Sequence, residues 1–171
     1  MNARTPSSQA RGMILIHSAS AALCPHVEWA LGSALGRRLE LTWPSQPAEG
    51  GARRTEHSWT GPVGTGAVLA SALAQIGHLR FEITEEPTGA SDGQRYCFTP
   101  ALGTFTAVTG VHGDILIPED RLRYAVANDA LGGEPVQHAL ERLLGVPWDE
   151  ELDVFRYAAE DAPVRWLHQV V

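Results

Sequence analysis

Apolar runs and amphipathic stretches alternate along the first half of the chain. Residues 12–16 form a continuous apolar run ("GMILI"), as expected of a strand buried on both faces, and the run stops at His17. Apolar positions then recur at helical spacing from Val27 to Leu35, behind a proline at the first helical position and ahead of Gly36. The pattern therefore predicts a strand followed by a helix.

Three more segments alternate apolar and polar residues in the way that strands do. They are residues 39–43 ("LELTW"), 54–60 ("RTEHSWT") and 79–85 ("LRFEITE"), and a second helix follows the glycine-rich link 61–66 ("GPVGTG"). The predicted order over residues 12–85 is βαββαβ, a ferredoxin-like core. Right-handed crossovers would make the first and third strands parallel neighbours, with both helices on one face.

The second half of the chain predicts an α+β fold with additions to this core. Residues 93–117 read as added strands that form a hairpin, and residues 118–161 read as acidic helices, each opened by a proline. We expect one domain over residues 12–171, with residues 162–171 as a tail or a final strand. Residues 1–11 are polar and are expected to be a disordered N-terminal tail.

A serine- and histidine-containing segment precedes the first predicted helix, and a glycine-rich segment precedes the second. In the ferredoxin-like arrangement both helix starts would lie at one edge of the sheet, where free backbone N–H groups and two positive dipole ends favour an anion or a polarised carbonyl. The alternative is that these residues only cap helices, because Ser, Thr and Gly are ordinary at helix starts. The candidate ligand-binding residues are His17, Ser18, Ser20, Cys24, His26, Trp59, Gly64, Thr65 and Gly66.

Cys24 is the sharpest candidate for catalysis. A thiol at a helix N-terminus with His17 or His26 nearby would be activated as a nucleophile. We favour the simpler interpretation that Cys24 is a small packing residue. A metal site would need His17, Cys24, His26 and His57 to converge, but their spacing matches no standard motif, so neither a metal nor a cofactor is expected.

The composition is that of an ordinary globular chain. Apolar residues make up 44% and charged residues 19% of the 171 positions. All thirteen basic residues are arginine, which excludes mechanisms that need a lysine. Cys24 and Cys97 lack metal or redox spacing and indicate a reduced, cytoplasmic protein. No stretch approaches the length of a signal-peptide core or a transmembrane helix, so no membrane association is expected.

Negative charge concentrates in the C-terminal part. The net charge is −7, and residues 118–161 hold eleven acidic residues against four arginines. Such a surface repels phosphate backbones, so no nucleic-acid partner is expected. Acidic helical faces are more often solvated than bound to a partner, although this one could meet a basic face of another protein.

Two further sets of residues are placed by the pattern. The outward strand positions carry alternating charges, among them Arg80 and Glu82, which suit an exposed or partly covered sheet face. Trp43 and Trp59 are expected in the core. The other pair, Trp148 and Trp166, lies at junctions where an aromatic ring typically holds an appended element in place.

Four blocks of the sequence resemble a small actinobacterial family of unknown function. They are "HSASAALCPHVEWAL", "GTGAVLASAL", "LRFEITEEP" and "HGDILIPEDRLR", and the resemblance covers nearly the whole chain from Gly12 onward. It implies a cytosolic actinobacterial protein, in agreement with the lysine-free composition, and it supplies no catalytic residues. Some relatives in that family are encoded beside type II fatty-acid-synthesis genes. This association, which the resemblance alone provides, implies an accessory or regulatory role in acyl metabolism.

Two classes of function remain in view. The first, which we favour, is a non-catalytic binding or regulatory protein whose partner is a protein or a small anionic or acyl ligand. The second is a small cytosolic enzyme that uses Cys24 with His17 or His26. A ferredoxin-like fold alone does not separate them, because that fold supports many functions.

Overall fold

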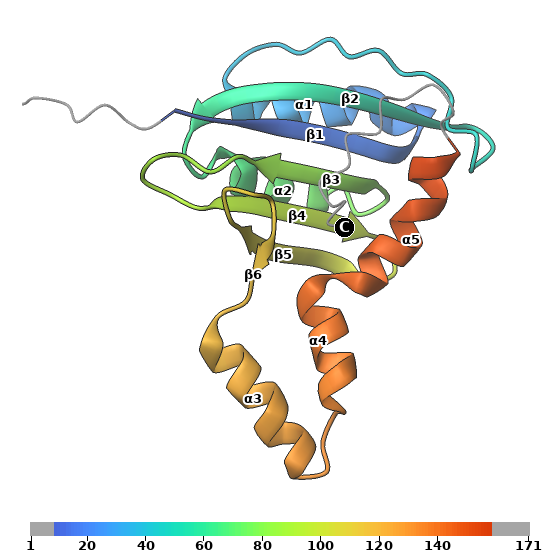
Figure 1. Ribbon diagram of the computed structural model, residues 1–171. Helices are drawn as coiled ribbons and strands as arrows, with labels where there is room; N and C mark the ends of the chain where they lie inside the picture. The colour runs from blue at the N-terminus through green and yellow to red at the C-terminus, as the bar shows by residue number, and fades with distance from the viewer. Residues whose placement is uncertain (1–8, 159–171) are drawn as a thin grey trace, which may run out of the picture.

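Within residues 9–158, which the computed structural model describes, six strands form one antiparallel sheet in the order β2-β1-β3-β4-β5-β6 (Figure 1). The strands are β1 (Gln9–Ser20), β2 (Ala52–Pro62), β3 (Arg80–Glu85), β4 (Gly93–Thr99), β5 (Gly103–Thr109) and β6 (Ile115–Leu116). The helices are α1 (Cys24–Leu35), α2 (Thr65–Ala74), α3 (Glu119–Ala130), α4 (Val136–Leu144) and α5 (Val146–Tyr157), with a 3-10 turn at Ala21–Leu23. The predicted α+β class is confirmed.

The helices form two groups around the sheet. Helices α1 and α2 cover one face and pack against each other, whereas α5 lies across the other face (Figure 1). Helices α3 and α4 extend beyond the β5–β6 edge (Figure 1). The acidic C-terminal part therefore both covers the sheet, through α5, and projects from it.

The main core lies between the sheet and the α1–α2 layer. Ile14, Ile16 and Ile83 of the central strands are fully buried there, together with Leu31 of α1 and Leu69 of α2. Burial of each such side chain contributes about 2 kcal/mol, which makes this layer the main source of stability. The continuous apolar run of β1 thus reflects its place between β2 and β3.

The predicted ferredoxin-like arrangement is not confirmed. Residues 39–43 form no strand, although they alternate as a strand would. The Leu41 N–H and the Trp43 indole N–H both donate to the Glu28 carboxylate of α1, at 2.9 and 3.0 Å, so this segment is held by a helix side chain rather than by a sheet ladder. Trp43 still packs against the core, as expected.

The two helix starts do not share an edge of the sheet. Strands β1 and β2 are neighbours but antiparallel, so that Ser20 pairs with Ala52 at one end and Gln9 with Pro62 at the other. The glycine-rich link 61–66 therefore lies at the opposite end of the sheet from the start of α1. The prediction of parallel strands was wrong because it counted residues 39–43 as a strand. Without a strand there, the chain runs through β2 in the direction opposite to the predicted one.

The ends of the chain differ from expectation in part. Strand β1 begins at Gln9, so residues 9–11 are ordered in the sheet rather than part of a disordered tail. It also continues past His17 to Ser20. The remaining tail, residues 1–8, and the predicted final segment, residues 162–171 with its tryptophan, lie outside the described residues.

Trp148 attaches the helical part to the sheet, as its position predicted. Its indole N–H donates to the Gly103 carbonyl at 3.0 Å, and its ring lies 5.2 Å from the Phe105 ring. Gly145 fits directly on this pair, because a Cβ there would lie 2.7 Å from the Phe105 ring. The joint between α4 and α5 is therefore closely packed against β5.

Candidate functional site

His17 and Ser18 lie in β1 at an irregularity of its pairing, between Ile16 and Ala19. The His17 ring nitrogen Nε2 is 2.7 Å from the Glu82 carboxylate, and the Ser18 hydroxyl donates to Glu49. Bulged positions often re-aim side chains toward functional groups. Here the re-aimed side chains are satisfied by carboxylates of the protein itself.

Cys24 is the first residue of α1 and is buried. Its thiol donates a weak hydrogen bond to the Ser20 carbonyl, at 3.6 Å. Within residues 9–158 no hydrogen bond joins it to a histidine: His17 contacts Glu82, and His26 is exposed. Burial raises the pKa of the Cys24 thiol, and the Glu28 carboxylate raises it further. An activated nucleophile requires the opposite shift.

Thiol titration tests the state of Cys24. Because the pKa of this thiol is raised, its alkylation by iodoacetamide should have a midpoint above the ordinary value of about 8.5. Peptide mapping by mass spectrometry distinguishes it from Cys97, whose pKa is also raised by burial. An alkylation midpoint of Cys24 below about pH 7 would instead indicate an activated thiolate and would support the enzyme hypothesis.

The start of α2 carries its own anion. The Glu85 carboxylate at the end of β3 is buried and accepts hydrogen bonds from the backbone N–H groups of Gly64 and Gly66, each at 2.8 Å. The Thr65 hydroxyl donates to the Pro62 carbonyl at 2.7 Å. The donors expected to bind a ligand at this helix start are therefore occupied by the chain.

Trp59 is fully buried, as expected of a core residue, and is not available to a ligand. Its indole N–H donates to the Thr84 carbonyl at 3.2 Å. The candidate binding residues are thus divided between the two ends of the sheet, and most of them are engaged in internal contacts. The sequence analysis missed Glu85 as a functional residue. It is the last residue of β3, and its carboxylate binds the backbone N–H groups at the start of α2.

A buried ion cluster lies under α5, on the sheet face opposite α1. Glu82 of β3 contacts His17 of β1, Arg95 of β4 at 3.0 Å and Arg156 of α5 at 2.6 Å. Asp149 of α5 completes the cluster, 2.5 Å from Arg95 and 2.9 Å from Arg156. Sequence alternation placed Glu82 on an exposed or partly covered face, because it could not show that α5 covers this position.

The cluster holds Glu82 in its charged form. Burial by itself would raise the pKa of Glu82, but its hydrogen bond and electrostatic interaction with His17 and the positive charges of Arg156 and Arg95 outweigh it and hold that pKa well below its usual range. The carboxylates in turn raise the pKa of Arg95 and Arg156 against the effect of their own burial. Each charged group of the cluster has a partner of opposite charge, although the Arg95 Nε–H is buried without a hydrogen-bond partner, and the cluster joins α5 to three strands.

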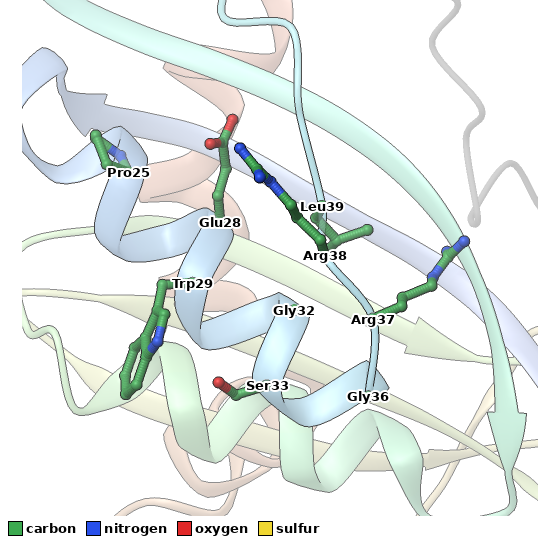
Figure 2. A pocket seen from close by; sticks show the side chains of 9 residues that line it. All are labelled: Pro25, Glu28, Trp29, Gly32, Ser33, Gly36, Arg37, Arg38 and Leu39. Atoms are coloured by element: carbon green, nitrogen blue, oxygen red, sulfur yellow. The ribbon is translucent and has the colours of Figure 1, made fainter.

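A shallow groove of about 590 Å³ runs along the outer side of α1 and the segment after it (Figure 2). Glu28 lines it but already accepts two hydrogen bonds from residues 41 and 43. Trp29 of α1 also lines the groove and is 75% exposed, and Arg37 and Arg38 line it from the segment after the helix (Figure 2). Within the described residues no group of three His, Cys, Asp or Glu side chains could hold a metal ion.

Helices α3 and α4, residues 119–144, form an arm with little burial of its own, which we call the α3–α4 arm. Ala125 and Ala139 are its buried side chains, one on each helix. The exposed apolar side chains of the arm and of its connecting turn are Leu122, Tyr124, Val126, Leu131 and Leu144. Tyr124 and Leu131 are 73% and 87% exposed, which is unusual for large apolar residues so close together.

The fold and these features describe an α+β protein with a projecting helical arm and a buried ion cluster between the sheet and α5. The chain belongs to the family described as "Protein of unknown function (DUF3145)", which matches residues 13–169. Comparisons with curated proteins and with solved structures find no match. Within residues 9–158, none of the helices combines the length and the apolar composition needed to cross a membrane.

Proposed function

We propose that this chain is a non-catalytic binding or regulatory protein that holds a partner protein through the α3–α4 arm. The observation that carries the proposal is the exposure of large apolar side chains along two helices whose own contacts bury only one alanine each. Exposed apolar patches of this kind mark interaction sites in soluble proteins. The arm projects from the sheet edge, where a partner has access to both of its sides (Figure 1).

The charges of the arm favour a basic partner. Two arginines of the arm are already paired, Arg123 with Glu119 and Arg142 with Glu134. No ion pair within residues 9–158 involves the exposed Asp120 or Asp129, and Arg121 is the one arginine of the arm without a carboxylate partner there. A partner surface with an apolar centre and surrounding arginine or lysine side chains would complement this arrangement.

The arm is presented in a fixed position. Its C-terminal end continues into α5 through Gly145, at the joint where Trp148 packs on Phe105. Helix α5 is in turn held by the ion cluster around Glu82. A preorganised surface loses less conformational entropy on binding, which supports a role for the arm in recognition.

Other forms of the proposal have less support. A small anionic or acyl ligand at the helix starts would compete with Glu85, which already accepts the hydrogen bonds there. An enzyme built on Cys24 is disfavoured by the raised pKa of its thiol. A role beside fatty-acid synthesis rests on the family resemblance alone. Free Cys24 and Cys97 fit a reducing cytoplasm.

An arm variant tests the proposal. The double substitution Tyr124→Glu with Leu131→Glu places charge on the exposed apolar surface, and we expect it to reduce the recovery of a specific partner by about tenfold or more. The measurement is affinity capture from native lysate with quantitative mass spectrometry. Partner recovery should also fall as salt is raised, because the complementary charges become screened.

The matched control is Val111→Glu, in the turn after β5, where the valine is 74% exposed and lies outside the arm. This variant should retain the partner that the wild-type chain captures. Equal recovery by the arm variant and the wild type would exclude the arm as the binding surface. Recovery of no specific partner by the wild-type chain would remove the support for a protein-binding function.

A further inference from the structure

The central strand β1 carries two large apolar side chains that lie outside both cores. Met13 and Leu15 alternate with the buried Ile14 and Ile16, so they point to the opposite face of the sheet. Leu15 pairs with Glu82 of β3, and both therefore lie on the face that α5 packs against. Met13 and Leu15 are half-buried, and in the described part of the chain neither belongs to either apolar cluster. We call these two side chains the Met13–Leu15 surface.

Helix α5 attaches to other strands of this face. Its ion pairs and ring contacts reach Glu82 of β3, Arg95 of β4 and Phe105 of β5. A sheet face that carries large apolar residues is normally covered by another layer of the fold. Helix α5 supplies that layer over β3 to β5, and the Met13–Leu15 surface marks where β1 offers a place for a further segment.

The chain continues from α5 directly beside this surface. The Gln46 side-chain amide donates to the Phe155 carbonyl of α5 at 3.3 Å and to the His17 carbonyl of β1 at 2.7 Å. The end of α5 thus lies next to β1, close along the strand to Leu15 (Figure 1). Because a strand rises about 3.4 Å per residue, a segment that starts at His17 reaches Met13 within about 14 Å.

Residues 159–171 have the length and the composition to cover the Met13–Leu15 surface. Extended chain of this length spans more than about 40 Å. The last eight residues, "VRWLHQVV", include three valines, a leucine and Trp166. An indole ring makes favourable contacts with a methionine thioether. The family match continues to residue 169, so most of this segment belongs to the same domain as the sheet.

The charges at the start of β2 complement those of the same segment. Arg54 lies on the same sheet face as Leu15, where β2 begins beside Gln46. Its Nε–H is buried without a hydrogen-bond partner, and within residues 9–158 no carboxylate pairs with it. Glu160 and Asp161 follow the end of α5 directly and bring two carboxylates to this arginine.

We infer that residues 159–171 bind over β1, with Trp166 packed on the Met13–Leu15 surface and the acidic residues beside Arg54. A tethered segment has an effective concentration in the millimolar range, so it occupies the surface in preference to a free partner of equal affinity. The inference is independent of the proposed function of the α3–α4 arm, because it concerns a different surface and a different occupant.

Trypsin cleavage of the full chain after Arg165 tests the inference, because bound residues are protected and proteolysis follows the population of the open form. Leu15→Glu and Trp166→Ala should each raise the rate of cleavage after Arg165 by about tenfold or more. Mass spectrometry of the intact chain measures the loss of residues 166–171. Each rate is divided by that of the synthetic peptide 159–171 with the same sequence, which removes the effect of the substitution on trypsin itself.

A second measurement reports the contact directly. The chain has two methionines, Met1 and Met13, so a chain labelled with ¹³C-methyl methionine gives two signals that are readily assigned. The ring current of Trp166 should shift the Met13 methyl signal upfield in the wild type, and Trp166→Ala should abolish that shift. This measurement holds even if Leu15→Glu fails to fold, which circular dichroism detects.

The matched control is Thr106→Glu, which places the same charge on an exposed strand position of the opposite sheet face. Its rate of cleavage after Arg165 should equal that of the wild type. A wild-type chain cleaved as fast as the free peptide would overturn the inference, and so would a Met13 signal that Trp166→Ala leaves unchanged. Protection that appears only at concentrations where light scattering shows a dimer would place the segment on a second copy and overturn it as well.

Discussion

Replacing Gly12 with alanine is expected to have the largest effect of any single methyl addition in the central sheet. A Cβ at Gly12 would lie 1.7 Å from the Thr84 carbonyl oxygen and 3.0 Å from the Trp59 ring. The first of these is a backbone atom of the neighbouring strand β3, so no side-chain rotation relieves the overlap. The missing side chain is what lets the Trp59 indole reach that same carbonyl.

The expected loss in the free energy of unfolding exceeds about 4 kcal/mol, which is a large fraction of the stability of an ordinary domain. Urea denaturation followed by circular dichroism measures it. Gly50→Ala is the matched control, because a Cβ there would meet no atom within 4 Å, and its stability should equal that of the wild type. A Gly12→Ala protein with wild-type stability would show that β1 and β3 can separate far enough to admit a methyl group at no cost.

Substituting Glu82 with glutamine is expected to cost about 3 to 5 kcal/mol, because it removes the charge on which Arg95 and Arg156 converge while leaving both guanidinium groups in the buried cluster. The side chain keeps its size, so the effect is electrostatic rather than a cavity. Glu40→Gln is the control: this carboxylate contacts Arg38 at the surface, and its loss should have little effect.

The pH dependence identifies the charge as the cause. Because the pKa of Glu82 in the folded protein lies well below its unfolded value of about 4.3, its contribution is fully present above that value and is lost as the pH falls through the folded pKa. The stability difference between the wild type and Glu82→Gln should therefore be largest near neutral pH and shrink in acid below about pH 4. A difference that is constant down to pH 3 would contradict this account.

Local patterns predicted most elements of the fold. The structure contains the elements that depend on local sequence alone. They are the strand at the apolar run 12–16, the helix that begins near Pro25 and ends before Gly36, and the helix predicted from the apolar spacing after residue 66. The topology failed at one place. Residues 39–43 alternate correctly but give their hydrogen bonds to Glu28, a choice that depends on a side chain more than ten positions away.

The candidate site was harder to predict for the same physical reason. Gly64, Thr65 and Gly66 do form a helix start, but sequence spacing could not show that Glu85 fills it from another strand. Likewise, period-two alternation correctly placed Arg80 and Glu82 on one sheet face and could not show that α5 covers it. Exposure of Tyr124 and Leu131 on the arm depends on tertiary packing and has no local signature.

The contact of Glu85 with the start of α2 has a consequence for the order in which the molecule assembles. The first turn of α2 has no side-chain cap of its own, and its cap comes from a residue about twenty positions later, at the end of a strand. That carboxylate is in place only after β3 has joined β1. Helix α2, which has no charged residues to stabilise it alone, therefore gains a complete N-terminus only when the central strands have paired, and we expect its first turn to become stable after the sheet has closed.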